Sequence, residues 1–299
     1  MENYKIVHKE GLEFLADIED KTVDLVLTDP PYITSRDSGM DRWVAHVAEQ
    51  NKPGATDVKT EAEWAKLKTE AEWNEWMDKG NIAEDHRADK LTTLKKNFLK
   101  YGSIYGEKYA VVTDHGEWDS DFTMDKLEEF VGDFYRVLKD HGTCIIFFDL
   151  WKITDLKNIM EKCGFQQIRL IEWVKTNPQP LNSKRNYLTN CREIALLGVK
   201  KSKPTFNSEY DKGIYSYPIA SGKDRWHTTQ KSLPLFEDLV NKHSNEGDLV
   251  LDCFLGSGTT AVACLKNQRK FTGCEVNEEY CKKSLDRVKK TLDKDEKLG

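Results

Sequence analysis

The segment VDLVLTDPPY, at residues 23–32, places several groups that could do chemistry directly after an apolar run. The run is typical of a buried strand, and Pro30 must end it because proline cannot donate to a sheet ladder. The strand is followed by a stiff segment that holds the carboxylate of Asp29, backbone carbonyls and the ring of Tyr32. Ligands of open α/β sheets bind at such strand ends, although aspartate and proline are also ordinary turn residues.

A second candidate site lies in LVLDCFLGSGTT, residues 249–260, where an apolar strand runs into Asp252 and the turn Gly256-Ser257-Gly258. Glycines let a ligand approach the backbone closely, and the helix expected after the turn offers free N–H groups. The next expected strand ends at Glu275, which is placed to accept hydrogen bonds from ribose hydroxyls. Because the turn lacks a third glycine and a basic residue, it favours an adenosine ligand without phosphates over a dinucleotide.

Strand and helix signals alternate on both sides of a long polar segment, which predicts a doubly wound, Rossmann-like, mostly parallel α/β sheet. The expected strands are 4–7, the run ending at Asp29, 143–149, 167–174, 192–199, 248–253 and 270–275. The expected helices are 12–18, 123–138, 152–162, 232–243, 258–267 and 277–291.

The polar segment, residues 33–117, interrupts this alternation and contains four of the eight tryptophans. The sequence TEAEW occurs at 60–64 and at 69–73, and each copy has the Thr and Glu of a capping box. We expect two short helices that fold Trp64 and Trp73 inward. The segment is therefore interpreted as an inserted helical subdomain or lid whose tryptophans form its core, with a nucleic-acid clamp or a dimer surface as the alternative.

Bulk composition excludes several classes of protein. The net charge of −6 excludes a uniformly basic nucleic-acid binder, although a local basic patch remains compatible with it. The seven cysteines contain no C-x-x-C, so we expect reduced thiols and no metal site. No apolar run approaches the length of a membrane span and no signal-peptide core is found, so we expect a soluble, cytoplasmic protein.

Together, the two motifs resemble those of amino-methyltransferases, which move a methyl group from S-adenosylmethionine to an exocyclic amine of adenine or cytosine. Residues 29–32 match that family's catalytic D-P-P-Y, and residues 252–260 match its cofactor motif, D-P-F-x-G-S-G-T-T. HTTQKSLPLFEDLV (227–240) is similar to the H-P-T-Q-K-P element, and WVKTNPQP (173–180) to a segment near the target base. Because the catalytic motif comes first in the chain, the resemblance is to the β group of DNA amino-methyltransferases.

The resemblance implies site residues and a division into domains. A catalytic domain would comprise residues 1–32 and 118–299, with 33–117 as the insertion. The implied catalytic residues are Asp29, Pro30, Pro31 and Tyr32. The implied cofactor-binding residues are Glu10, His227, Thr229, Lys231, Asp252, Phe254, Gly256, Ser257, Gly258, Thr259 and Glu275. The chain departs from the family pattern at Cys253, Leu255 and Thr228, and Glu10 stands where the family usually has an aspartate.

The chemistry needs acceptors aimed at the two N–H groups of the amine, and Asp29 with the carbonyl of Pro30 could supply them. Tyr32 would stack on a flipped-out base, with Trp173 or Pro178 close by. For DNA contact we expect Lys175, Asn177, Lys184 and Arg185. Arg192 and the lysines between 200 and 203 are expected to be ordinary surface charges.

The predicted function is methylation of adenine N6 in a specific sequence of double-stranded DNA, without a metal. Cytosine-N4 methylation, RNA methylation and a catalytically silent nucleic-acid-binding module remain the alternatives, whereas an oxidoreductase would need the third glycine. The recognition element is expected in 33–117, in 200–226, or in both. The resemblance also suggests a homodimer and a cognate restriction endonuclease as partners.

Overall fold

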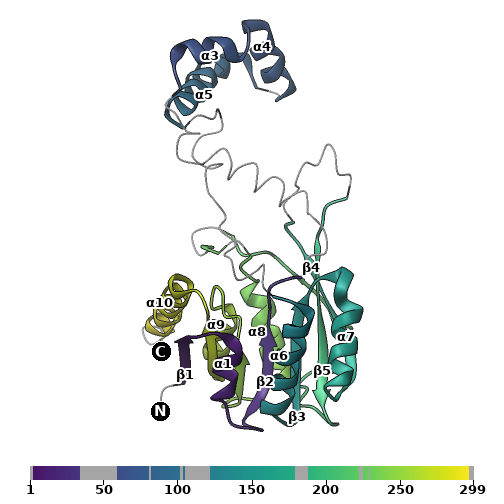
Figure 1. The fold of residues 1–299 in the computed structure, drawn as a ribbon. Coiled ribbons are helices and arrows are strands. Elements are labelled where there is room, and N and C mark those ends of the chain that lie inside the picture. The colour runs from purple at the N-terminus through teal and green to yellow at the C-terminus, as the bar shows by residue number, and fades with distance from the viewer. Residues whose placement is uncertain are drawn as a thin grey trace. The chain divides into compact units, whose positions relative to one another are not determined.

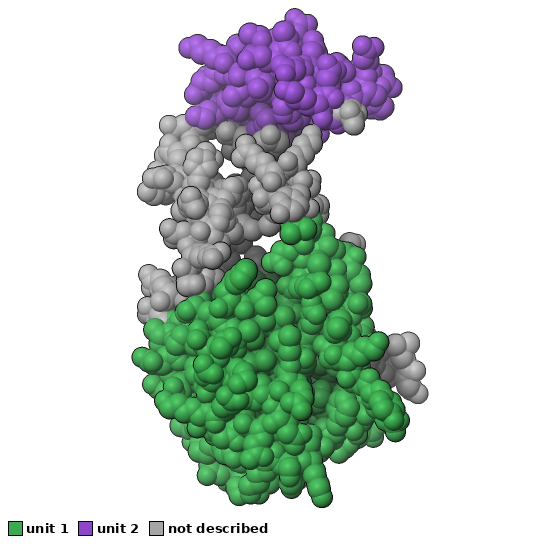
Figure 2. Space-filling view, turned by 90° about the vertical axis from the view of Figure 1, so that its right-hand side faces the viewer, with its two compact units in different colours: residues 1–33, 117–299 green, residues 34–116 purple. Residues whose placement is uncertain are grey.

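The structure is a computed structural model. It describes residues 3–33, 59–80, 82–101, 104, 122–178, 188–221, 225–227 and 229–295. The chain divides into two compact units, which Figure 2 colours separately: residues 1–33 with 117–299, and residues 34–116.

The first unit is built on an eight-stranded sheet with the order β1-β8-β7-β2-β3-β5-β4-β6 (Figure 1). The strands are β1 (Tyr4–His8), β2 (Val23–Thr28), β3 (Leu138–Phe148), β4 (Phe165–Lys175), β5 (Arg192–Lys200), β6 (Ile214–Tyr217), β7 (Leu249–Asp252) and β8 (Lys270–Glu275). All neighbouring pairs are parallel except those of β5, which is antiparallel to β3 and to β4. The predicted mostly parallel, Rossmann-like sheet is confirmed, and β6 is a strand that the sequence analysis did not predict.

Helices cover both faces of this sheet. They are α1 (Gly11–Ala16), α6 (Met124–Val137), η4 (Leu150–Lys152), α7 (Ile153–Lys162), α8 (Leu233–His243), α9 (Thr259–Lys266) and α10 (Glu278–Asp295). Val26 of β2 packs into the core shared with α1, α6 and α7, whereas Leu25 and Leu27 pack into the core shared with α8, α9 and α10. This alternation is the period of two expected of a strand that is buried on both faces.

Lys200, at the end of β5, corrects one prediction. It is only 5% exposed, and its ammonium group donates to the carbonyl oxygens of Tyr135 at 2.6 Å and Leu138 at 2.8 Å. These carbonyls lie at the end of α6, where unpaired oxygens give the helix a partial negative charge. Lys200 is therefore a buried helix cap, and the prediction of a surface charge was wrong because the sequence does not show what a lysine packs against.

The second unit is helical. Its elements are α3 (Glu61–Leu67), α4 (Glu70–Lys79), η1 (Glu84–His86) and α5 (Arg87–Tyr101). Both capping boxes form, at Thr60 and at Thr69, so the prediction of two short helices is confirmed. The rings of Trp64 and Trp73 stack with centroids 5.0 Å apart in a core that α5 completes. The predicted role of these tryptophans as core residues is thus confirmed.

The sheet of the first unit determines where a site can form. Parallel strands bring their carboxyl ends to one edge, so the residues that follow β2, β7 and β8 lie along the same edge. The antiparallel β5 contributes its first residues, Arg192 and Glu193, to this edge. Among the described residues, no helix is long and apolar enough to cross a membrane.

Candidate active site

Asp29 lies at the carboxyl edge of the sheet, one residue beyond the end of β2. Its side chain is 21% exposed, and Oδ2 lies 2.9 Å from the ammonium nitrogen of Lys231. Oδ1 is buried and has no hydrogen-bond partner in the described part of the chain. Burial raises the pKa of Asp29 to about 6, although the Lys231 cation opposes this rise. A buried acceptor without a partner is rare in proteins, and at this edge it marks a position for a donor from a ligand.

Lys231 connects Asp29 to two further groups. Its ammonium nitrogen lies 2.6 Å from Oε2 of Glu193 and 3.4 Å from the hydroxyl of Tyr32. The side chain is 9% exposed. Burial lowers the pKa of Lys231, but the surrounding anionic groups outweigh this and keep it well above its usual value, so the group remains a cation. Burial also raises the pKa of Tyr32 well above its usual range, so its hydroxyl remains protonated.

Glu193 closes the network from the side of β5. Its second oxygen, Oε1, pairs with Lys175 at 2.6 Å. Burial would raise the pKa of Glu193, but Lys231 and Lys175 outweigh burial and bring it to about 2. Four charged side chains, two acidic and two basic, thus form a chain of contacts from Asp29 to Lys175.

The sequence analysis assigned these four residues to different sets. Asp29 was predicted as catalytic, Lys231 as cofactor-binding and Lys175 as DNA-binding, and Glu193 was not predicted as a site residue. The available signal for Glu193 was that it is the single acid among the basic residues of 175–203. Its position became visible only with the antiparallel pairing of β5, which brings its amino end to the edge where the parallel strands end.

The glycine turn after β7 forms the second part of the site. Gly256 and Gly258 have φ of +50° and +75°, in the left-handed region that favours glycine. The N–H of Gly256 donates to Oε2 of Glu275 at 2.7 Å, and the N–H of Asn277 donates to Oε1 at 2.9 Å. A Cβ placed on Gly256 would meet nothing closer than 3.9 Å, and His227 would be 4.0 Å away. At Gly256 a Cβ would therefore make ordinary van der Waals contacts with Phe254 and His227, without a clash.

Asp252 supports this turn from inside the protein. It is 3% exposed. Its Oδ1 accepts from the hydroxyl of Thr28 at 2.7 Å and the N–H of Phe254 at 3.0 Å, while Oδ2 accepts from the hydroxyl of Thr260 at 2.6 Å. Burial raises its pKa to about 6. Asp252 thus ties the end of β2 to the turn after β7.

The remaining predicted cofactor residues occupy several environments. The hydroxyls of Ser257 and Thr259 are buried and lie 3.0 Å from each other. Phe254 packs against Phe130, with ring centroids 4.7 Å apart. Glu10 caps α1, since its Oε2 accepts from the N–H of Leu12 at 2.7 Å.

One face of α10 holds the glycine turn, and the sequence analysis did not predict it. Ser284 donates to the carbonyl of Gly256 at 2.6 Å, and Arg287 donates to the carbonyl of Ser257 at 2.8 Å. The ring centroids of Tyr280 and His227 lie 4.8 Å apart. Positions 280, 284 and 287 have the spacing of a single helix face, which was the signal available in the sequence. Thr229 adjoins His227, with its N–H 3.3 Å from Nδ1 of the ring.

The predicted DNA-contacting and base-stacking residues have mixed surroundings. Lys175 is paired with Glu193, and Asn177 accepts from the N–H of Ile219 at 2.7 Å. Lys184 and Arg185 lie outside the described residues. Trp173 is 1% exposed and its indole N–H donates to the carbonyl of Tyr217, so its ring is part of the core.

Tyr32 is the half-buried aromatic ring of the tetrapeptide. Its centroid lies 6.1 Å from that of Phe148, in an edge-on arrangement. The Lys231 ammonium lies 5.4 Å from the Tyr32 ring. The ring is therefore held in a fixed position beside the carboxylate of Asp29.

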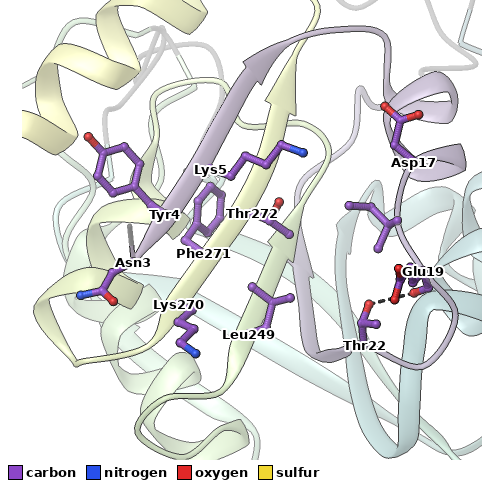
Figure 3. Close-up of a pocket in the computed structure, with 11 residues that line it drawn as sticks. Asn3, Tyr4, Lys5, Asp17, Glu19, Thr22, Leu249, Lys270, Phe271 and Thr272 are labelled. Atoms are coloured by element: carbon purple, nitrogen blue, oxygen red, sulfur yellow. Dashed lines mark hydrogen bonds between the residues drawn. The ribbon is translucent and has the colours of Figure 1, made fainter. Parts of the chain in front are cut away.

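A hollow at the opposite edge of the sheet, where the parallel strands begin, does not belong to this site. Figure 3 shows it beside the first residues of β1 and β8, with Tyr4, Lys5 and Lys270 among its lining residues. The dashed line joins the Thr22 hydroxyl to the carbonyl oxygen of Glu19, at 2.8 Å. In the described part of the chain, four buried side-chain atoms lack a hydrogen-bond partner, and none of them belongs to a residue that lines this hollow. The groups suited to chemistry gather at the carboxyl edge.

Comparison with known proteins identifies relatives over most of the chain. The sequence model of the N6/N4 DNA methylase family matches residues 23–286. The type II methyltransferase M2.DpnII of Streptococcus pneumoniae is 32% identical over 205 residues, which are 62% of this chain and 76% of that protein. The type II methyltransferase M2.MboI of Moraxella bovis is 24% identical over 292 residues, 93% of this chain and 85% of that protein.

Solved structures agree with the fold. The crystal structure of M1.HpyAVI in complex with SAM has a TM-score of 0.59 and 25% identity, and the match covers 95% of this chain and 98% of that one. The PvuII DNA methyltransferase, described as cytosine-N4-specific, has a TM-score of 0.61 at 14% identity, covering 98% and 91% of the two chains. At that identity the second likeness shows the fold alone.

Proposed function

The chain belongs to the N6/N4 DNA methylase family, and from this premise we propose that it methylates N6 of adenine in a specific sequence of double-stranded DNA. The chain is thus a DNA methyltransferase, and the choice of base and of site residues is the proposed part. The observation that carries this proposal is the carboxylate of Asp29, which has one oxygen held by Lys231 and one buried oxygen without a partner.

The glycine turn fits S-adenosylmethionine as the methyl donor. The left-handed turn at Gly256 and Gly258 lets a ligand approach the backbone closely, and the carboxylate of Glu275 keeps lone pairs for ribose hydroxyls beyond its contacts with backbone N–H groups. His227 and Phe254 lie at the same turn and offer ring surfaces. When bound, S-adenosylmethionine supplies a methyl group on a positively charged sulfur.

Asp29 and the carbonyl of Pro30 would activate the amine. The lone pair of the exocyclic nitrogen is conjugated into the base, which makes it a poor nucleophile. Two acceptors aimed at its N–H groups draw the nitrogen towards tetrahedral geometry and free the lone pair. Pro30 and Pro31 keep these acceptors rigid, so little reorganisation is needed during the reaction.

Asp29 would also stabilise the positive charge that develops on the nitrogen and accept the proton that the nitrogen loses. Positive charge grows on the nitrogen as it takes the methyl group, and a carboxylate in a half-buried site stabilises it. The nitrogen then loses a proton, which Oδ1 of Asp29 can accept. A pKa of about 6 leaves the carboxylate ionised at neutral pH yet basic enough to act as a proton acceptor.

Tyr32 would hold the base against these acceptors. A base inside a duplex cannot reach a site at this edge, so the target nucleotide must flip out. The fixed ring of Tyr32 offers a face on which the base can stack. We further propose that residues 33–117, residues 200–226, or both read the recognition sequence. We also propose that the enzyme acts beside a cognate endonuclease, as the type II relatives suggest.

Adenine is favoured over cytosine because an aspartate begins the tetrapeptide, whereas cytosine-N4 enzymes of similar sequence typically have a serine there. Cytosine N4 is the second candidate, since the amine chemistry is the same for both bases. The fold shared with the cytosine-N4-specific PvuII enzyme is compatible with either base.

The test is methyl transfer from labelled S-adenosylmethionine to unmethylated genomic DNA, followed by nucleoside mass spectrometry. We expect N6-methyladenine, and sequencing of the methylated sites would then define the recognition sequence. N4-methylcytosine would overturn the choice of base, and label in RNA alone would overturn the choice of substrate.

A further inference from the structure

Lys231 lies where three elements meet around the carboxylate of Asp29. Asp29 and Tyr32 follow β2, Glu193 lies in β5, and Lys231 itself precedes α8 by two residues. The motif resemblance predicted a cofactor ligand at this position. In the structure, the ammonium group instead contacts the two acids and the tyrosine hydroxyl.

We infer that Lys231 is a positioning residue for the catalytic carboxylate: it holds Oδ2 of Asp29, directs Oδ1 towards the reacting amine, and keeps the carboxylate ionised. This inference rests on the proposed function, in which Asp29 receives the amine. It assigns Lys231 to the chemistry of the base and not to the methyl donor.

The first argument is geometric. A carboxylate at a strand end can rotate about its Cβ–Cγ bond, so either oxygen could face the substrate. The 2.9 Å contact with Lys231 removes this freedom by holding Oδ2. The lysine is itself held by Glu193 at 2.6 Å, and it lies 5.4 Å and 5.6 Å from the rings of Tyr32 and Phe147. A buried lysine with these contacts has one available position.

The second argument concerns charge. Asp29 and Glu193 are both acidic and both face Lys231, and Glu193 also pairs with Lys175. Burial raises the pKa of Asp29 to about 6, Lys231 lowers it and Glu193 raises it, while the neighbouring Tyr32 hydroxyl makes a smaller contribution that lowers it. Without the lysine, burial and the neighbouring acid would both favour the protonated form of Asp29, which can neither accept the N–H proton nor stabilise the growing charge.

The experiment compares three variants with the wild type. Lys231→Met removes the cation but keeps an unbranched side chain, Lys231→Arg retains the cation, and Glu193→Gln removes the neighbouring negative charge. The matched control is Lys242→Met, because Lys242 is a 20% exposed lysine of α8 that pairs with Asp211 and Asp238, outside the Asp29 network. For each protein, we would measure the affinity for S-adenosylmethionine by calorimetry. Single-turnover methyl transfer would be measured across about pH 5 to 9. This range covers the acid limb of the pH–rate profile, where the rate should fall as Asp29 is protonated.

Lys231→Met should leave the affinity for S-adenosylmethionine within about twofold and lower the transfer rate at neutral pH by about tenfold or more, the range of a lost charge contact. Its acid limb should move to higher pH by about one unit, because Asp29 becomes harder to ionise. Glu193→Gln should move the limb in the opposite direction, since it removes an anion that raises the pKa of Asp29. Lys231→Arg should keep most of the rate, and Lys242→Met should shift neither quantity.

Two results would overturn the inference. A tenfold weaker affinity in Lys231→Met, with a normal rate at saturating donor, would make Lys231 a cofactor ligand. A rate that falls equally at every pH, with the limb unmoved, would make it a structural ion pair only.

A separate readout distinguishes failure of the inference from failure of the proposed function. Carboxyl NMR of aspartate-labelled protein, with Asp29→Asn to identify the resonance, follows the titration of Asp29 without any DNA. A higher pKa in Lys231→Met supports the inference, and an unchanged pKa contradicts it. A wild-type protein that methylates no DNA would reject the proposed function and leave this titration as the test of Lys231.

Discussion

The neighbouring parallel strands β2 and β7 each have an aspartate at the carboxyl end, Asp29 directly after β2 and Asp252 as the last residue of β7, and the two have different surroundings. Asp29 has one oxygen on Lys231 and the other without a partner in the described chain. Asp252 has both oxygens occupied, by Thr28, Phe254 and Thr260. Burial raises the pKa of both aspartates to about 6. Residue type and the direction of the pKa shift are therefore the same. The two differ in exposure, 21% for the Asp29 side chain against 3% for Asp252, and in hydrogen-bond partners, so Asp29 is available to a substrate and Asp252 is structural.

The two loops also differ in backbone. Two prolines stiffen the loop after β2, whereas Gly256 and Gly258 allow left-handed turns in the loop after β7. A rigid loop suits the positioning of a reacting atom, and a glycine turn suits close contact with a bound molecule. Thr28 links the two, because it precedes Asp29 and donates to Asp252.

The same substitution at both aspartates should separate their roles. Asp29→Asn keeps the shape but removes the negative charge, so we expect methyl transfer to fall by about 10²- to 10⁴-fold, the range for a lost acid–base group. Its thermal unfolding temperature should stay close to that of the wild type. Rapid-quench transfer assays and calorimetry would check both, and a variant with near-normal transfer would remove Asp29 from the mechanism.

Asp252→Asn should act mainly on stability. An amide can accept from Thr28 and Phe254, but its NH₂ group meets the Thr260 hydroxyl and leaves one buried N–H unpaired. An unpaired buried donor costs about 1–3 kcal/mol, which denaturant titration would detect as a lower free energy of unfolding. If this variant were as inactive as Asp29→Asn while fully stable, the comparison between the two loops would fail.

The pH dependence distinguishes the two aspartates further. Asp29 must be ionised to accept a proton, and its folded-state pKa of about 6 predicts that single-turnover rates fall as pH drops through 6. The fall should approach about tenfold per pH unit on the acid side. Asp252 has a similar pKa, so Asp252→Asn serves as the control and should keep the same limb. If Asp252→Asn lost the acid-side fall in rate, the titrating group would be Asp252 and the assignment to Asp29 would be contradicted.

Thr28→Val should give the smallest effect. Thr28 is fully buried, and valine keeps its shape but removes the hydroxyl that Asp252 accepts from. We expect the free energy of unfolding to fall by about 0.5–1.5 kcal/mol, the net value of one hydrogen bond. Methyl transfer should fall far less than in Asp29→Asn. A loss of transfer without a loss of stability would show that the link between the loops acts in the reaction itself.

Most of the fold could be predicted from the sequence because its signals are local. Hydrophobic periodicity, prolines and glycines mark strand and helix ends within a few residues of the chain. Pairing is not local, so the antiparallel insertion of β5 was not predicted. The four residues of β6, IYSY, gave too short a pattern to separate from a packed loop.

The candidate site likewise has parts that could be predicted from the sequence and parts that could not. The tetrapeptide and the glycine turn were recognisable because each consists of consecutive residues. The contacts of Lys231 with Asp29 and Glu193 join positions far apart in the chain, which only the tertiary fold brings together. Charge in a sequence does not reveal burial, which is why Lys200 was predicted as a surface charge.

The central claim is that Asp29 acts on the amine while the glycine turn holds the methyl donor. Calorimetric titration of S-adenosylmethionine into Asp29→Ala, alongside a transfer assay on the same preparation, tests it most directly. We predict an affinity within about twofold of the wild type and no detectable transfer, since the substitution lies outside the donor site. Loss of donor binding in Asp29→Ala would contradict the claim.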